Sequence, residues 1–314
     1  MHRKKSSIKG GALLTALFIM TLVAIVATAM TVRLQLDIYR TRLIITHDKL
    51  YLASQAVTFW TLDELSNKKN NFAKADSSGR VAQFPRNLET LYPQIQVSGA
   101  IYDLQSRYNL NNQIDKRAII SFVNLQKNTL SQTNEVENRN RALALYDWLS
   151  PYNINRGKDN YTTYYLSQKP PYFPSHQLMQ SSSELRLVKE ISGSNYLALE
   201  PFIIALPETT AINLNTAPKQ VLETLGNGLR DEQINKIILA RGENGIKKMS
   251  DISELLKKLN LSSGQVSIES QYFLSIAHAK NEEFNLTVYT LYKRSRNNKR
   301  KIAVSIIRES INGF

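Results

Sequence analysis

The feature that most constrains this chain is an apolar stretch near its N-terminus. From Gly10 through Val32 the sequence contains no Asp, Glu, Lys or Arg. A helix rises about 1.5 Å per residue, so a helix of this length spans roughly 30 Å, the thickness of the hydrocarbon core of a bilayer. The residues before it carry basic side chains and no acid, and such flanks stay in the cytoplasm. The sequence therefore predicts one transmembrane helix, with its N-terminus in the cytoplasm and most of the chain beyond the membrane.

A cleaved secretory signal also has a basic head and an apolar core, so it is the main alternative to a retained helix. A signal core is roughly 7–15 residues long and ends at an Ala-x-Ala-like site. The apolar run here is longer, and Ala27-Thr28-Ala29 is the nearest candidate for such a site. The small-residue break lies instead at Gly10-Gly11, in front of the apolar segment, which favours a helix that stays in the protein.

A basic peptide that ends in Gly before an apolar helix resembles the leader of type IV prepilin-like proteins. The resemblance implies that residues 1–10 are a leader, that prepilin peptidase cuts between Gly10 and Gly11, and that it methylates the new N-terminus. Most relatives carry Glu five residues into the mature chain, where this chain has Thr15. A carboxylate within the membrane costs about 2.5–3.5 kcal/mol or more unless it finds a partner. A subunit at the tip of a fibre has no subunit ahead of it to supply a partner for this carboxylate. The absence of this Glu resembles the protein K family of large minor pseudopilins in type II secretion.

Helical spacing continues beyond the apolar stretch without a breaker to about Asn67. The apolar residues of this second half recur at three-, four- and seven-residue intervals, which is typical of one face of an amphipathic helix. They are Leu43, Leu50, Ala53, Val57 and Trp60. The sequence predicts a single rod, and we expect this stripe to pack on a β-sheet and on neighbouring subunits.

The remaining patterns predict an α+β fold. Alternating or β-rich runs at Ile95–Leu104 (broken by Gly99), Tyr272–Ala279, Phe284–Lys293 and Lys301–Glu309 predict an antiparallel sheet, and helical spacing dominates between them. A long N-terminal helix with a membrane-spanning lower half would pack on that sheet, which a large inserted all-α domain interrupts. The predicted units are the leader 1–10, the transmembrane helix 11–32, the pseudopilin helix and first strands 33–112, the inserted α-domain 113–266 and the C-terminal strands 267–314.

Three further strings resemble the protein K family: Asp103–Asn112, Ser183–Val188 and Ile212–Pro218. The Asp and Asn side chains of the first string are of the kind that bind backbone groups at turns, so we expect them to satisfy the change from strand to helix. A sugar- or metal-binding role for this cluster is the alternative. In the last string, Thr216 is placed to cap a helix that has Pro218 in its first turn.

The turn Gly226-Asn227-Gly228 lies between two predicted helices. This arrangement resembles a helix-hairpin-helix unit, whose backbone amides can bind a DNA phosphate. The alternative function is therefore a membrane-anchored periplasmic helix-hairpin-helix DNA-binding protein for DNA uptake. Asp231 and Glu232 follow the turn, where a phosphate would favour Lys or Arg. The net charge of +14 is spread along the chain, so nucleic acid is not the expected partner.

Catalytic and metal-binding motifs are missing from the sequence, so we expect no enzymatic activity and no required cofactor. The chain has no cysteine, and its four histidines are scattered. The family resemblance implies a Ca²⁺ site in the loop after the helix that contains Trp148, but Ca²⁺ requires six to eight oxygen ligands, several of them carboxylates. Here that loop keeps only Asp147 and Asp159 and carries Lys158. If calcium binds, Asp147, Asp159 and Asn160 are the candidates.

Taken as a whole, the resemblance implies a minor pseudopilin at the tip of the type II secretion pseudopilus. Such a subunit initiates or caps assembly for the export of folded proteins across the outer membrane. The implied partners are other minor pseudopilins, the major pseudopilin, prepilin peptidase and the inner-membrane secretion platform. The implied location is the bacterial inner membrane, crossed once, with most of the chain periplasmic. A generic membrane-anchored adaptor, which would keep its leader, remains an alternative.

Overall fold

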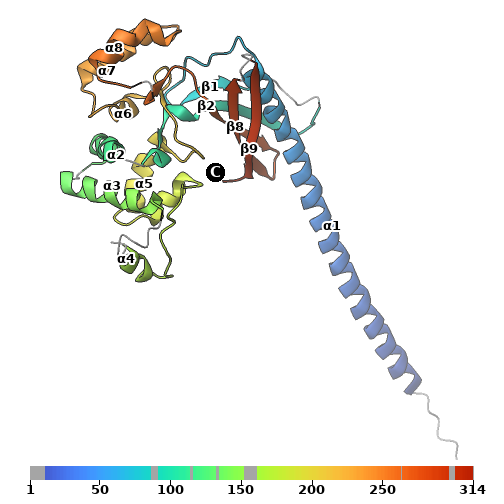
Figure 1. Cartoon of the computed structure of the whole chain (residues 1–314). Coiled ribbons are helices and arrows are strands. Elements are labelled where there is room, and N and C mark those ends of the chain that lie inside the picture. The colour runs from blue at the N-terminus through green and yellow to red at the C-terminus, as the bar shows by residue number, and fades with distance from the viewer. Residues whose placement is uncertain are drawn as a thin grey trace, which may run out of the picture.

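A computed structural model describes residues 11–85, 91–113, 116–131, 134–151, 161–262, 264–296 and 301–313. Figure 1 shows a long helix running down from a β-sheet, with a helical domain on the other side of that sheet. The helix, α1, covers Gly11–Ser66 without interruption and is therefore about 84 Å long at 1.5 Å per residue. It is long and apolar enough to cross a membrane. The predicted rod is confirmed, and its first described residue is Gly11.

The central sheet has five antiparallel strands in the order β1-β2-β7-β8-β9. Their bounds are Arg80–Gln83 for β1, Gln96–Asp103 for β2, Tyr272–Lys280 for β7, Asn285–Arg296 for β8 and Ile302–Ile311 for β9. The three predicted C-terminal strands and the strand after Ile95 are confirmed, whereas β1 was not predicted. Strands β2 and β7 are direct neighbours, with Asp103 opposite Phe273. The whole α-domain is therefore inserted between two adjacent strands.

Gly99 lies inside β2, where it pairs with Ala277, so the prediction that it breaks the strand was wrong. A Cβ atom at this position would stand 2.5 Å from Cγ1 of Val57 on α1. The absence of a side chain therefore lets the helix approach the sheet closely.

Helix α1 covers one face of the sheet and the inserted domain covers part of the other. On the helix side, Leu50 and Val57 pack with Val288 and neighbouring residues of β7 and β8. On the opposite side, Leu274 and Leu291 of the sheet pack with residues 204 and 206 of the inserted domain. The sheet is thus the middle layer of three.

The inserted domain is built of short helices around one continuous hydrophobic cluster. Its α-helices are α2 Lys116–Thr129, α3 Glu135–Leu149, α4 Thr162–Leu166, α5 Gly193–Leu199, α6 Lys219–Leu222, α7 Asp231–Arg241 and α8 Ser253–Lys258. Its 3₁₀ turns are η1 Leu104–Ser106, η2 Leu110–Asn112, η4 Ser182–Leu187, η5 Glu200–Phe202 and η6 Met249–Ile252. It also contains two parallel ladders of two residues each, which the prediction of an all-α domain left out. They pair β3 Tyr108–Asn109 with β4 Ile203–Ile204, and β5 Ile212–Asn213 with β6 Val266–Ser267.

Candidate functional site

The predicted stripe on α1 faces the protein's own sheet. Leu50, Ala53 and Val57 are 2%, 0% and 0% exposed, while Leu43 is half-buried and Trp60 packs edge-on against Phe84 with ring centroids 5.5 Å apart. The expected contact with a sheet is therefore present. A side chain that is fully buried within its own chain cannot also touch a neighbouring subunit, so for these three residues the contact is internal.

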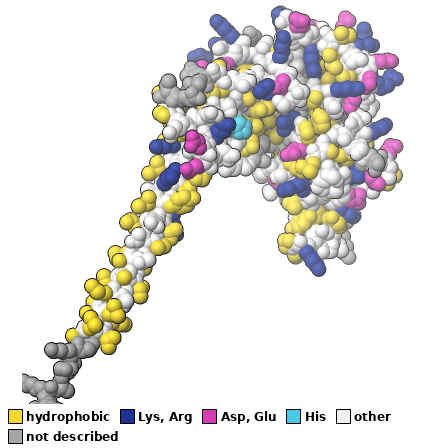
Figure 2. All heavy atoms as spheres, turned by 180° about the vertical axis from the view of Figure 1, so that it is seen from behind, with side chains coloured by type: hydrophobic (Ala, Val, Ile, Leu, Met, Phe, Trp, Pro, Cys, Tyr) yellow, Lys and Arg dark blue, Asp and Glu magenta, His cyan; other side chains and the backbone are white. Residues whose placement is uncertain are grey.

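A second apolar row, absent from the sequence prediction, lies on another face of α1. It consists of Ile38, Ile45, Leu52 and Phe59, which we call the outer row and which are 60%, 49%, 57% and 67% exposed. These residues also recur every seven positions, the same signal that marked the buried stripe. At 100° per residue the outer row points roughly opposite to Leu50 and Val57. Figure 2 shows hydrophobic side chains along the helix up to the head.

Thr15 makes its hydrogen bonds within the helix. Its Oγ1 lies 3.1 Å from the carbonyl oxygen of Gly11 and 3.0 Å from that of Ala12, and the hydroxyl can donate to either. Its hydroxyl therefore needs no partner from another chain, whereas a carboxylate at this position would. Gly10 and the rest of the predicted leader lie outside the described residues.

A buried polar network joins the sheet to the inserted domain, and Asp103 is at its centre. This residue ends β2, is 1% exposed, and accepts a hydrogen bond from the backbone N–H of Gln105 at 2.8 Å. Its other carboxylate oxygen accepts from Nδ2 of Asn213 at 2.9 Å and from the hydroxyl of Thr216 at 2.6 Å. Burial raises the pKa of Asp103, and the donors that surround it, including Ser270, oppose that rise.

Thr216 therefore does not cap a helix, as the sequence suggested. Helix α6 begins after Pro218 and has no side-chain cap. The hydroxyl of Thr216 is directed to Asp103, which lies 113 positions earlier in the chain. Sequence spacing gives no signal of such a long-range partner.

The asparagines of the first family string make the same kind of connection. Asn109 accepts from the backbone N–H groups of residues 111 and 206, and Asn111 donates to the carbonyl oxygens of residues 179 and 206 at 2.9 and 2.7 Å. Asn112 exchanges two hydrogen bonds with the backbone of Thr210, at 2.7 and 2.9 Å. The predicted structural role of these residues is confirmed: their amides satisfy backbone groups of the inserted domain.

Arg294 holds the end of α1 on the sheet. This residue of β8 is 5% exposed and donates to the carbonyl oxygens of Leu65, Asn67 and Asn70 at 2.8, 3.1 and 2.8 Å. Its guanidinium carbon lies 5.5 Å from the centroid of the Phe72 ring. Burial lowers the pKa of Arg294. A cation at the C-terminal end of a helix also interacts favourably with the helix dipole.

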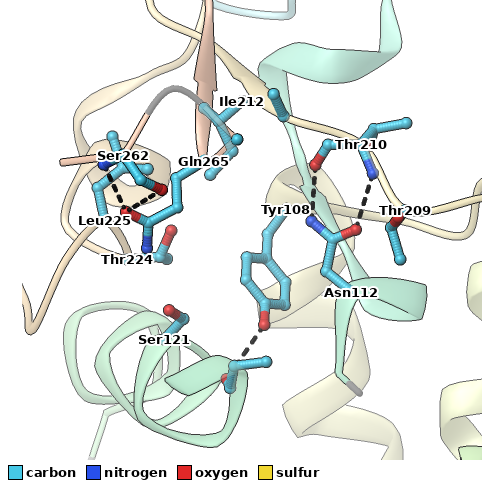
Figure 3. Close-up of a pocket in the computed structure, with 13 residues that line it drawn as sticks. Tyr108, Asn112, Ser121, Thr209, Thr210, Ile212, Thr224, Leu225, Ser262 and Gln265 are labelled. Atoms are coloured by element: carbon cyan, nitrogen blue, oxygen red, sulfur yellow. Dashed lines mark hydrogen bonds between the residues drawn. The ribbon is translucent and has the colours of Figure 1, made fainter. Parts of the chain in front are cut away.

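A polar pocket of about 320 Å³ lies in the inserted domain, shown in Figure 3. The hydroxyl of Tyr108 donates to Gln113 or to the carbonyl oxygen of Ala118, and Asn112 is bonded to Thr210. Across the pocket, Gln265 accepts from residue 262. Several polar side chains of the lining are thus hydrogen-bonded to nearby backbone or side-chain groups. None of the residues that line the pocket carries a formal charge. The pocket therefore offers neutral hydrogen-bonding groups.

The hairpin that resembles a DNA-binding unit is present, and two acidic side chains, Asp231 and Glu232, lie in the first turn of the helix that follows it. Gly226 and Gly228 adopt φ values of +61° and +99°, as the tight turn requires, before α7 begins at Asp231. Lys219 lies 2.9 Å from the carboxylate of Asp231 and is paired with it, whereas Arg230, which directly precedes α7, is exposed. This arrangement does not favour phosphate binding.

Only one of the candidate calcium ligands falls in the described structure. Asp147 lies in α3, near Tyr165, whereas Asp159 and Asn160 lie outside the described residues. In the described part of the chain, no group of three or more His, Asp or Glu side chains could hold a metal ion. Calcium binding stays an untested prediction.

Comparisons with known proteins agree with the family suggested by the motifs. Two family models, each described as type II secretion system (T2SS), protein K, match residues 100–208 and 212–273, together more than half of the chain. The chain is 27% identical over 307 residues to type II secretion system protein K of Pseudomonas aeruginosa, which covers 93% of this chain and 91% of that protein. It is 25% identical over 326 residues to the protein of the same name from Aeromonas hydrophila, with 92% and 94% coverage.

A solved structure with the same fold is the crystal structure of the GspK-GspI-GspJ complex from the enterotoxigenic Escherichia coli type 2 secretion system. The TM-score is 0.63 at 20% identity, with 88% of this chain and 100% of that chain covered. At this identity the likeness shows a shared fold.

Proposed function

This chain belongs to the protein K family of the type II secretion system, and on that basis we propose that it caps or initiates the pseudopilus. It is a minor pseudopilin, a structural subunit and not an enzyme. In the proposed role it occupies the tip of the fibre and assists the export of folded proteins across the outer membrane.

The observation that carries the proposal is the buried hydrogen-bond network that attaches a bulky domain to the sheet of the pseudopilin fold. The inserted domain leaves the sheet at Asp103 and returns at Tyr272, and the buried network at Asp103 fixes it there. A domain held in one orientation can obstruct the addition of a subunit above it, whereas a freely hinged domain could move aside.

We further propose that α1 anchors the protein in the bacterial inner membrane, with the N-terminus cytoplasmic and the rest periplasmic. Within the described residues, α1 is the one helix long and apolar enough to cross a membrane, which supports an anchor. The protein in the similar structure is in complex with GspI and GspJ, which supports minor pseudopilins as partners of this chain. Prepilin peptidase, the major pseudopilin and the secretion platform are proposed from family membership.

The first test is the N-terminal sequence and mass of the protein from its native membrane. We expect a mature chain that starts at Gly11 and is N-methylated. An intact leader would point to a plain membrane anchor, and DNA binding with a strong salt dependence would then be the next measurement. Cleavage near Ala29 would make the protein secreted and contradict the proposal.

The second test removes the inserted domain. Strands β2 and β7 are antiparallel neighbours, and Asp103 is opposite Phe273. The ends of the two strands therefore lie close enough for a short turn to join them in place of residues 104–271. We expect longer or deregulated pseudopili from this variant. A matched control keeps the full chain but replaces exposed Thr209 by Val. Unchanged fibre length and secretion after the deletion would contradict a capping role.

A further inference from the structure

A groove of about 620 Å³ lies at the end of the head where α1 stops, far from the predicted membrane span, and we call it the distal groove. Two separate parts of the chain line it. One is the loop that follows α1 together with strand β1, and the other is the loop that follows α7 in the inserted domain. Figure 2 shows several Lys and Arg side chains, with some acidic ones, over this end of the head.

The two walls of the distal groove are held together by contacts within the fold. Gly245 packs so closely on Ala73 that a Cβ atom at Gly245 would stand 2.6 Å from the Cβ atom of Ala73. From the sheet, Arg294 donates to the carbonyl oxygens of Asn67 and Asn70 and so fixes the loop that follows α1. The groove is therefore built by the folded chain and is not a gap between unconnected loops.

The charge of the lining favours an anionic occupant. Lys69, Lys74 and Lys247 line the groove and are exposed, and among the residues that the structure describes their ammonium groups have no ion pair. The one acid in the lining, Glu64, is half-buried and already accepts hydrogen bonds from two side chains. Glu243 is exposed beside the groove but does not line it. Three cations and one anion leave the lining with a net charge of +2.

The neutral part of the lining favours a peptide over a phosphate polymer. Asn71 and Asn244 carry amides, a group that can donate to a peptide carbonyl and accept from a peptide N–H. Val81 and Ala82 of β1 add apolar surface. Lysines for carboxylates, amides for backbone groups and apolar surface for aliphatic side chains together match an acidic peptide in an extended conformation.

Two other occupants are disfavoured by position and by sequence. Helix α1 ends at Ser66, which at 1.5 Å per residue is about 50 Å beyond Val32, so lipid of the same bilayer does not reach the groove. The chain has no run of three consecutive Asp or Glu residues, so a second copy does not supply a strongly acidic segment. The occupant is therefore a different protein.

We propose that the distal groove binds an extended acidic segment of a separate periplasmic protein, whose carboxylates pair with Lys69, Lys74 and Lys247. This binding goes beyond the proposed capping role, because it is a property of the single chain. Only the access to the groove within the fibre rests on the proposed tip position, where no subunit lies above this end of the head.

The test compares two variants of the full-length protein, purified in detergent, that lose the same amount of charge. The groove variant combines Lys69→Gln, Lys74→Gln and Lys247→Gln. The control variant changes three exposed lysines of α2, α7 and α8 that do not line the groove. Its substitutions are Lys127→Gln, Lys236→Gln and Lys257→Gln. Tryptophan fluorescence should show that both variants remain folded.

The probe is a fluorescein-labelled peptide that repeats Asp-Ser-Val four times, and fluorescence anisotropy measures its binding. We expect saturable binding that is about fivefold or more weaker for the groove variant, since three exposed ion pairs together support that ratio. The control variant should bind as the natural chain does. A reference peptide with Asn in place of Asp should bind about fivefold or more weakly, and one with Gly in place of Val should also lose affinity.

Four results would overturn the inference. The first is no saturable binding of the Asp peptide, and the second is an equal loss of affinity in the groove and control variants, which would show a response to net charge alone. The third is equal binding of the Asp and Asn peptides. The fourth is inorganic polyphosphate that displaces the probe as well as the unlabelled Asp peptide does at the same concentration of charge. Because the purified chain is measured, the capping role can fail while this binding stands, and the reverse.

Discussion

Replacement of Asp103 by Ala tests whether the polar network attaches the inserted domain to the sheet. The change leaves the N–H of Gln105, the amide of Asn213 and the hydroxyl of Thr216 without the carboxylate that accepts from them. A buried donor that loses its acceptor costs about 1–3 kcal/mol. Loss of the buried charge, whose burial raises the pKa of Asp103, offsets part of that cost. We therefore take the lower limit for each of the three donors and expect the free energy of unfolding to fall by about 3 kcal/mol.

The two tryptophans give a separate signal for each layer. Trp60 lies between α1 and the sheet, and Trp148 lies in the core of the inserted domain. Denaturant unfolding of the full-length protein in detergent, with Trp60→Phe or Trp148→Phe as the background, reports each layer by itself. In Asp103→Ala we expect the two transitions to separate, because the connection between the layers is lost.

Two further variants check the reasoning about Asp103. Asp103→Asn keeps one acceptor oxygen and removes the buried charge, so it should retain more stability than Asp103→Ala. Thr209→Val, at an exposed position, should change the free energy of unfolding by no more than about 0.5 kcal/mol. A loss below about 1 kcal/mol in Asp103→Ala, with coincident transitions at both tryptophans, would refute the network as the attachment.

Two predictions concern the opposite side of the sheet and the loop before β1. Arg294→Lys should lower the free energy of unfolding by about 2–4 kcal/mol, because an ammonium cannot satisfy three separated carbonyl oxygens as a guanidinium does. Denaturant unfolding followed by Trp60 fluorescence measures this change. An unchanged midpoint of the unfolding transition would contradict the prediction. Hydrogen bonds from Ser78 and Arg80 lower the pKa of Asp76 to about 2, so the native state releases this proton more readily than the unfolded chain. Its stabilisation is present above an ordinary carboxyl pKa near 3.8 and is lost as the pH falls toward 2. Asp76→Asn should flatten the dependence of stability on pH in that interval, and an unchanged slope would show that Asp76 does not contribute.

Most of the fold could be predicted from local periodicity. The apolar span, the rod that ends near Asn67, helices α2 and α3 and the strands β7, β8 and β9 are all long enough to show a repeat of two or 3.6 residues. The elements that were missed are short. Strand β1 has four residues, and each strand of the two small ladders has two, which is too few for any period to be read.

The sequence predicted that Asp and Asn side chains make hydrogen bonds at the end of β2, but it did not predict which distant residues they reach. A run of Asp and Asn side chains at a strand end indicates local hydrogen bonding, and the structure confirms that for Asn109 and Asn111. The bond from Thr216 to Asp103 was not foreseen, because a Thr two positions before a Pro has a good local explanation as a helix cap. A contact across more than a hundred positions depends on how the insertion closes, and no local pattern contains that information.

The sequence of α1 carries two apolar rows, and the predicted stripe is the one that meets the sheet. The row Leu43, Leu50 and Val57 and the outer row that begins at Ile38 have the same seven-residue spacing and similar side chains. The residue that distinguishes them is Gly99 in β2, because only a position without a side chain accepts Val57 so closely. A glycine inside an otherwise alternating strand marks the point where a helix approaches. The apolar row of α1 that includes Val57 packs at this point and is buried against the sheet. The other row is then left at the surface.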